Sequence, residues 1–188
     1  MYRARFSDVY ADLVKEGIDV AIRTGALRDS SLVARPFSTQ ELLLFAAPSY
    51  LARAGTPTSV AELADHAAVL FRVPSNGRDR PWQFRVRGRN ASFMPPSRVH
   101  VDSGDAIVHA AVLGMGIAQV PHYMVSESLA RGELVELLPA TRPTAMPIAA
   151  VVPSARMVPS RVRALLELIE RNADALPAAP PVRAKPTR

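Results

Sequence analysis

The sequence contains no cysteine, which excludes disulfide bonds and thiolate chemistry. Lysine is almost missing as well, because only Lys15 and Lys185 among the 23 basic residues are lysines. No apolar run approaches the roughly 20 residues that a membrane-spanning helix needs. The first residues are not followed by the apolar stretch of a signal peptide. These absences predict a soluble, cytoplasmic protein without a membrane partner.

Motifs that mark common catalytic and cofactor sites are also missing. There is no Gly-x-Ser-x-Gly nucleophile elbow and no Gly-x-x-x-x-Gly-Lys phosphate loop. The four histidines show no metal-ligand spacing. Gly114-Met115-Gly116 lacks the third glycine of a dinucleotide fingerprint and follows an expected helix, so it is interpreted as a helix-to-strand turn. We therefore expect no enzymatic activity, no cofactor and no bound metal.

Positive charge, in contrast, is abundant. The formal net charge is +6, and seven arginines lie between Arg72 and Arg98, both included. Such a basic stretch can indicate nucleic-acid binding, but few aromatic residues accompany it and it contains no recognisable nucleic-acid module. A preference for arginine over lysine along a whole chain is also typical of a GC-rich coding sequence. We do not expect this chain alone to bind a promoter specifically.

The hydrophobic pattern predicts an α/β protein. Hydrophobic residues make up 48% of the chain, which is enough for a substantial core. Strand patterns alternate with helix patterns, and this alternation favours a largely parallel sheet. Strands are expected at 18–22, 32–37, 40–47, 68–73, 82–86, 91–94, 99–101, 117–120, 134–138 and 148–152, and helices at 6–14, 59–66, 106–113, 122–131 and 159–172.

Two turn-rich connectors, near Ala47 and near Met146, indicate that the chain passes from a first lobe to a second and then returns. Two crossings of this kind form a hinge beside a cleft. The predicted division gives residues 1–46 plus 147–176 to lobe I and residues 47–146 to lobe II. The Pro/Ala-rich residues 177–188 are expected to be a disordered tail.

Asp102-Ser103-Gly104-Asp105 is the most informative local pattern. It lies between an expected strand and an expected helix, and Asp and Ser are favoured helix caps. A cap without any ligand is the simpler interpretation. Alternatively, the helix N–H groups and the Ser103 hydroxyl bind an anionic or polar small molecule, which Gly104 allows to approach the backbone. The sequence by itself leaves both interpretations open.

Two other places are candidates for ligand contact. Ser7 is expected to cap the first helix. Arg23, Thr24 and Gly25 follow the end of an expected strand, and ligands gather at the carboxyl ends of strands. Arg23 is able to clamp a carboxylate, although a single arginine at a strand end is usually just solvated.

Several separate motifs, in the same order and spacing, resemble the LysR-type transcriptional regulators. Residues 6–25, Ser31-Leu-Val-Ala-Arg35 and Ala47-Pro-Ser-Tyr-Leu-Ala52 are similar to the first lobe of that family's regulatory region. Val101-Asp-Ser-Gly-Asp-Ala106 and Gly114-Met-Gly-Ile-Ala-Gln-Val-Pro121 are similar to the second lobe. The resemblance extends over about residues 5–172.

The resemblance implies an effector-binding domain with a two-lobed fold like that of type 2 periplasmic binding proteins, with two crossover connections. It also implies that a small anionic or aromatic molecule binds between the lobes and modulates a DNA-bound homo-oligomer. Carried over by position, the effector contacts would be Ser7, Arg23, Thr24, Gly25, Phe71, Arg72, Ser103, Gly104, Asp105 and Pro121.

The sequence departs from the family pattern at its beginning. The family's winged helix-turn-helix and linker helix have no counterpart in it, nor do the first strand and first helix of the first lobe. The resemblance therefore implies an incomplete first lobe, DNA binding only through a missing N-terminal domain, and homo-oligomers for the full-length regulator. A solute-binding protein of the same fold, an enzyme on this scaffold and a non-functional remnant of a longer gene are the alternatives.

Overall fold

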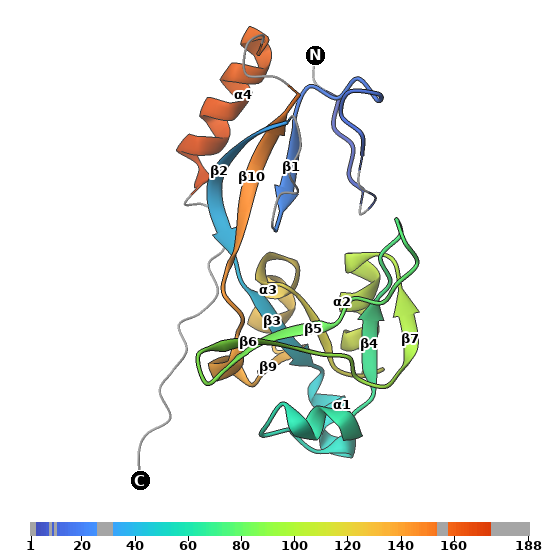
Figure 1. Ribbon diagram of the computed structural model, residues 1–188. Coiled ribbons are helices and arrows are strands. Elements are labelled where there is room, and N and C mark those ends of the chain that lie inside the picture. Colours follow the sequence, from blue (N-terminus) through green and yellow to red (C-terminus); the bar gives the residue numbers. More distant parts are fainter. Residues whose placement is uncertain (1–2, 8, 10, 26–31, 154–157, 174–188) are drawn as a thin grey trace. The chain divides into compact units, whose positions relative to one another are not determined.

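The computed structural model describes residues 3–7, 9, 11–25, 32–153 and 158–173. The chain forms two compact units (Figure 1), and it crosses into unit 1 at 40/41 and back into unit 2 at 144/145. Unit 1 contains Glu41–Thr144 and the segment up to Val9, and unit 2 contains Tyr10–Gln40 and the described residues after Thr144. Both crossings lie earlier than the predicted boundaries at 46/47 and 146/147. The predicted tail at 177–188 lies outside the described residues.

The sheet of unit 1 is mixed, and the expectation of a largely parallel sheet is wrong. β4 (Ala68–Phe71) pairs in parallel with β7 (Ser97–Val101), and a parallel bridge from Ala68 to Ile117 joins β4 to the start of β8 (Ala118–Pro121). β3 (Leu42–Ala46) runs antiparallel to both β8 and β9 (Val135–Leu137). A helical connection makes β8 and β9 run the same way, and β3 is inserted between them in the opposite direction.

Side chains alternate across this sheet and build a core on each face. Leu43 and Phe45 of β3 pack on the face that is covered by α2 (Gly104–Val112) and α3 (His122–Ala130). Leu44 packs on the other face, against Tyr50 of α1 (Pro48–Ala54) and Trp82. Burying each large apolar side chain of this kind contributes about 1.5–3 kcal/mol. The residues that follow Ala47, where a turn-rich connector was predicted, instead form α1.

The second face also carries a short helix and a hairpin. Before η1 (Ala61–Asp65), the Ser59 hydroxyl donates to the Glu62 carboxylate at 2.9 Å and accepts from the Glu62 N–H at 3.4 Å, and Thr58 N–H donates to the same carboxylate at 2.8 Å. β5 (Trp82–Val86) and β6 (Arg89–Phe93) form the predicted antiparallel hairpin. A further turn, η2 (Pro139–Thr141), follows β9.

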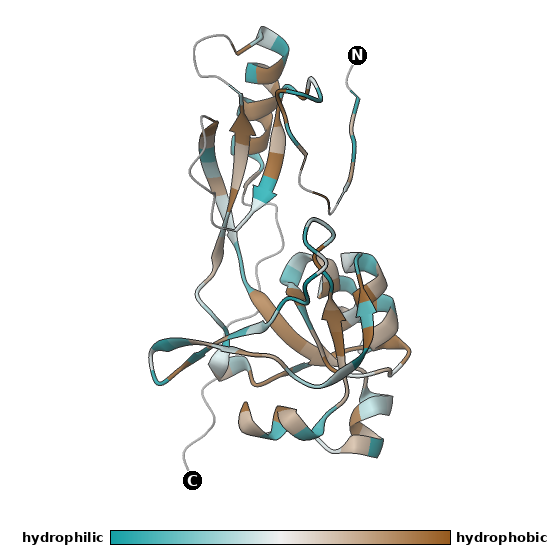
Figure 2. Ribbon diagram, turned by 45° about the vertical axis from the view of Figure 1, so that its right-hand side comes forward, coloured by the Kyte–Doolittle hydropathy of each residue, from teal (hydrophilic) through white to brown (hydrophobic). Residues whose placement is uncertain are grey.

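Unit 2 is a three-stranded antiparallel sheet with one helix. β10 (Met146–Val152) lies between β1 (Ala21–Thr24) and β2 (Val33–Gln40). α4 (Ser160–Arg171) buries Val162 and Leu166 against Ala150 and Val152 of β10. Figure 2 shows the corresponding apolar colouring along β10.

The predicted helix at 6–14 is wrong. Residues 3–7 and 9 have no regular secondary structure, and Phe6 and Val14 remain 95% and 67% exposed. Only a turn forms, in which Ile18 N–H donates to the Leu13 carbonyl at 2.9 Å and Gly17 has a φ of 63°. An amphipathic pattern becomes a stable helix mainly when its apolar face has a surface to pack on. Of the large apolar residues in 6–14 that the structure describes, which are Phe6, Val9, Leu13 and Val14, only Leu13 is buried.

Candidate functional site

Three parallel strand ends meet at one edge of unit 1. β4, β7 and β8 run in the same direction, so their carboxyl ends at Phe71, Val101 and Pro121 lie at the same side of the sheet. Arg72 N–H donates to the Val101 carbonyl at 2.7 Å, which ties the residue after β4 to the end of β7. We call this the carboxyl edge of unit 1. It brings together six of the residues expected from the sequence: Phe71, Arg72, Ser103, Gly104, Asp105 and Pro121.

α2 begins directly at the carboxyl edge. Ser103 is the N-cap residue with extended backbone angles, and its carbonyl accepts the first helical hydrogen bond, from Ile107 N–H at 3.2 Å. Its hydroxyl does not cap the helix and makes no hydrogen bond to any described residue. The first turn of a helix carries unpaired N–H groups and positive potential, which favour anions. Asp105 lies exposed in that turn, so its own carboxylate is one of the negative groups that this positive potential favours.

Gly104 lies where the start of α2 meets a side chain of α3. A Cβ at this position would lie 2.2 Å from the methyl carbon of Met124, which belongs to α3. The space above Gly104 is therefore filled by this side chain. Because methionine is flexible, a ligand is able to displace the methyl group at modest cost. Met124 was not expected at the site, and nothing in its sequence neighbourhood indicates that α3 packs against the start of α2.

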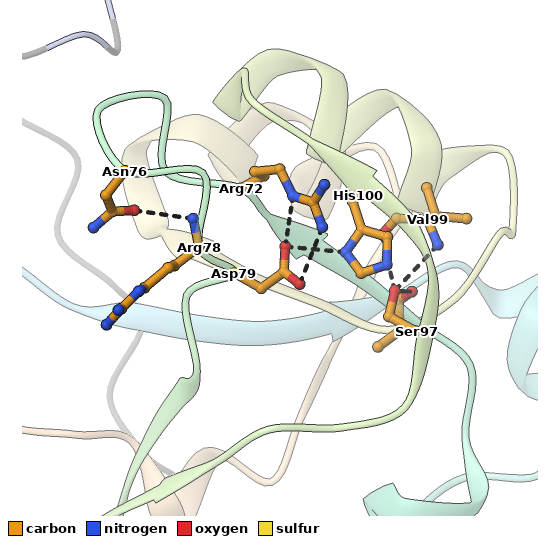
Figure 3. Close-up of polar contacts among 8 residues, drawn as sticks. Arg72, Asn76, Arg78, Asp79, Ser97, Val99 and His100 are labelled. Atoms are coloured by element: carbon orange, nitrogen blue, oxygen red, sulfur yellow. Dashed lines mark hydrogen bonds and ion pairs between the residues drawn. The ribbon is translucent and has the colours of Figure 1, made fainter.

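A polar cluster covers the ends of β4 and β7 (Figure 3). The guanidinium of Arg72 donates to both carboxylate oxygens of Asp79, at 3.1 and 3.4 Å, and Nδ1 of His100 lies 3.0 Å from the same carboxylate. The hydrogen bond from Arg72 is the main cause that lowers the pKa of Asp79, with His100 adding to it. The side chain of Arg72 nevertheless remains 50% exposed.

The loop that carries Asp79 is fixed to β4. Arg80 N–H donates to the Phe71 carbonyl at 2.8 Å, and the Arg80 guanidinium lies over the Phe71 ring, 4.7 Å from its centre. The Phe71 ring is thus already stacked by a cation. Sequence reasoning missed Asp79, Arg80 and His100. One signal was available, because Asp79 is the only acidic residue between Asp65 and Asp102.

Three of the remaining predicted contacts belong to unit 2, and one, Ser7, belongs to the first segment of the chain. Arg23 and Thr24 end β1 in unit 2, and Gly25 N–H donates to the Pro147 carbonyl at 2.9 Å with a φ of 100°. The Arg23 guanidinium donates to the Ala11 carbonyl at 2.8 Å. Ser7 caps no helix; its hydroxyl oxygen accepts from Val9 N–H at 3.1 Å.

The described part of the chain holds no cluster of three or more His, Asp or Glu side chains arranged to bind a metal ion. None of its helices is long and apolar enough to span a bilayer.

Comparison with known families decides the identity of this fold. The model of the LysR substrate binding domain matches residues 3–174. The chain belongs to this family. The LysR domain resembles the regulatory domain of CrgA from Neisseria meningitidis, with a TM-score of 0.74 and 30% identity over 85% of this chain and 78% of that one. The predicted α/β, two-lobed, periplasmic-binding-protein-like fold is confirmed.

Curated relatives of the LysR domain are transcriptional regulators. An uncharacterised HTH-type regulator of Haemophilus influenzae is 33% identical over 157 residues, which cover 84% of this chain and 54% of the relative. CrgA of Neisseria meningitidis is 32% identical over 164 residues, covering 87% and 54%. The LysR domain thus spans about half the length of the curated relatives that it matches. It is an effector-binding domain of the LysR type.

Proposed function

We propose that the carboxyl edge of unit 1 binds a small anionic effector, an aliphatic or aromatic carboxylate. The observation that carries this proposal is the free Ser103 hydroxyl at the start of α2, beside the chain that leads from β4 into Arg72. A hydroxyl with no partner, helix N–H groups and a half-exposed guanidinium are the donors that a carboxylate needs.

The local charges set limits on the ligand. Asp79 already neutralises part of the charge on Arg72, and Asp105 occupies the first turn of α2. A ligand with several negative charges would therefore meet repulsion as well as attraction. A monocarboxylate fits this balance, because it needs one guanidinium face and a few hydrogen-bond donors.

The effector acts through the whole regulator, in our proposal. In a longer regulator, the effector would bind to the LysR domain in the cytoplasm and change how a homo-oligomer holds DNA. The effector shifts that equilibrium only by its difference in affinity for the two states of the regulator. The predicted contacts at Ser7, Arg23, Thr24, Gly25 and Pro121 belong to the same proposal and need separate variants.

A thermal-shift screen of monocarboxylates and their neutral amides tests the proposal, followed by isothermal titration of the tightest carboxylate. Ser103→Ala should weaken binding about fivefold, the effect of one neutral hydrogen bond. Arg72→Gln should weaken it about 10- to 100-fold, because a charged donor is lost. Asp79→Asn should leave affinity equal or higher, since it releases Arg72 from its partner.

Matched controls separate the site from general effects. Ser92→Ala and Arg98→Gln change exposed residues of β6 and β7 by the same chemistry and should leave affinity unchanged. If Arg72→Gln and Arg98→Gln lower the affinity equally, the loss is caused by the overall charge of the protein and not by the proposed site. Unchanged affinity in both Ser103→Ala and Arg72→Gln contradicts the proposed site.

A further inference from the structure

The β5–β6 hairpin ends in a concentrated positive charge that the effector site does not use. Arg85, Arg87 and Arg89 are all exposed and lie within five consecutive residues at its loop end. No acidic residue occurs between Asp79 and Asp102. We call these three arginines and Gly88 the basic tip.

The geometry of the turn spreads the three guanidinium groups. Arg87 and Gly88 form a two-residue connection with φ values of 51° and 76°, the left-handed values of a tight hairpin turn. Arg85 pairs with Asn90, and Val86 pairs with Arg89, in the antiparallel register. Arg85 and Arg89 therefore point to opposite faces of the ribbon, while Arg87 lies at its end. The basic tip presents cations on three sides.

The base of the hairpin is held to the body of unit 1 by packing and by hydrogen bonds. Trp82 and Phe84 are buried in the core of unit 1. The Gln119 side chain of β8 accepts from Gln83 N–H and donates to the Gln83 carbonyl, both at 2.8 Å, as a neighbouring strand would. Figures 1 and 2 both show the loop end of the hairpin projecting beyond the body of unit 1, and Figure 2 colours it hydrophilic.

The charges of the basic tip have no counterions within the described protein. No carboxylate of a described residue lies within ion-pair distance of Arg85, Arg87 or Arg89. The one contact that Arg85 makes is with the Gly88 carbonyl at 3.4 Å, inside the turn itself. The basic tip is thus a surface of positive charge, without counterions among the described residues, at the loop end of the hairpin.

We propose that the basic tip binds the phosphate backbone of duplex DNA without reading its sequence. A two-stranded ribbon fits the width of the major groove, and arginines on both of its faces and its end are then able to reach phosphates. An acidic protein surface is the poorer partner, because stable protein interfaces need an apolar or aromatic centre. The tip offers only Val86, which is 37% exposed.

This inference goes beyond the proposed function and does not depend on it, because the carboxyl edge of unit 1 and the basic tip share no residue. The basic tip would add a salt-sensitive contact to DNA beside whatever sequence-specific contact a longer regulator makes. Binding of this type is weak, with a Kd on the order of 10⁻⁴ to 10⁻⁶ M at physiological salt.

Fluorescence anisotropy with a labelled duplex of arbitrary sequence tests the inference, using the 188-residue chain at about 50–200 mM salt. The test variant is R85Q/R87Q/R89Q. The control variant, R35Q/R163Q/R171Q, removes the same charge from exposed positions of β2 and α4. Far-UV circular dichroism, together with Trp82 fluorescence for unit 1, verifies that both variants are folded.

The tip variant should lower the affinity at least about tenfold and reduce the slope of log Kd against log salt by up to about 3, near 1 for each phosphate contact. The control variant should change affinity less than about threefold. Equal losses in both variants, or no measurable binding by the unaltered chain at low salt, overturn the inference. Competition by poly-glutamate as strong as by DNA overturns it as well, in favour of an acidic protein partner.

Discussion

Arg142 is predicted to be the most important ionic residue for the stability of unit 1. It lies two residues before the second crossing, and its side chain is only 8% exposed. It donates to the Glu136 carboxylate at 2.6 and 2.7 Å, and to Glu41, the first residue after the first crossing, at 2.9 Å. One guanidinium thus fastens both connecting segments to unit 1.

The expected cost of Arg142→Gln follows from the burial of its partners. Breaking a buried ion pair costs about 3–5 kcal/mol, because a charge is left without compensation. Glu136 is 16% exposed and Glu41 is 34% exposed, so both carboxylates regain some hydration in the variant. We therefore expect a loss of about 2–3 kcal/mol in the free energy of unfolding. Glu136→Gln should cost less than Arg142→Gln, and Glu41→Gln should cost the least.

Urea denaturation followed by Trp82 fluorescence measures this effect. Trp82 is the only tryptophan and is 3% exposed in the core of unit 1, so its emission reports that unit alone. Arg131→Gln is the matched control, since its ion pairs with Glu127 and Glu133 are at the surface and should contribute less than about 1 kcal/mol. If Arg142→Gln lowers the free energy of unfolding no more than Arg131→Gln does, the buried ion pairs of Arg142 stabilise unit 1 no more than surface pairs, which contradicts the prediction.

Three further predictions concern unit 1. Gly116→Ala would place a methyl group 2.5 Å from the Ala67 carbonyl oxygen, and should destabilise the unit by about 1–3 kcal/mol in the same urea assay; an unchanged midpoint contradicts this. Gln119→Glu removes the amide that donates to β5 at 2.8 Å, and should cost about 1–3 kcal/mol and increase hydrogen exchange in β5. Because Arg72 lowers the folded-state pKa of Asp79 below its ordinary 3.8, this pair stabilises the protein above pH 3.8 and loses that contribution as the pH falls through the folded pKa. Asp79→Asn should flatten the acid side of the stability profile, and an unaltered profile would exclude the pair as a contributor.

Local sequence patterns predicted most elements because they depend on neighbouring residues only. The strand expected at 40–47 formed as β3, the strands expected at 82–86 and 91–94 formed as β5 and β6, and the expected turn at Gly114 formed with a φ of 73°. The direction of β3 did not follow from the sequence, because the hydrophobic pattern of a strand is the same whether it pairs in parallel or antiparallel with its neighbours. The expected helix at 6–14 did not form. Among the described large apolar residues of this segment, only Leu13 packs against the rest of the protein, while Phe6, Val9 and Val14 are exposed.

The candidate site divides in the same way. Ser103 was identified from its position between strand and helix, and Arg72 from the expected end of a strand. Asp79 and Met124 were missed, because a loop and a helix that are distant in sequence bring them to the carboxyl edge. Only the three-dimensional contacts show that Arg72 is held by a carboxylate and that Gly104 is covered by a side chain.

The most direct test of the effector site is a backbone-amide NMR titration of the chain with the tightest monocarboxylate from the screen. We expect the largest chemical-shift changes at residues 103–106 and at Arg72. Ser103→Ala should weaken these changes, and the neutral amide of the same ligand should produce none. Shifts that avoid the start of α2, or that are identical with the neutral amide, would contradict an anion site at the carboxyl edge of unit 1.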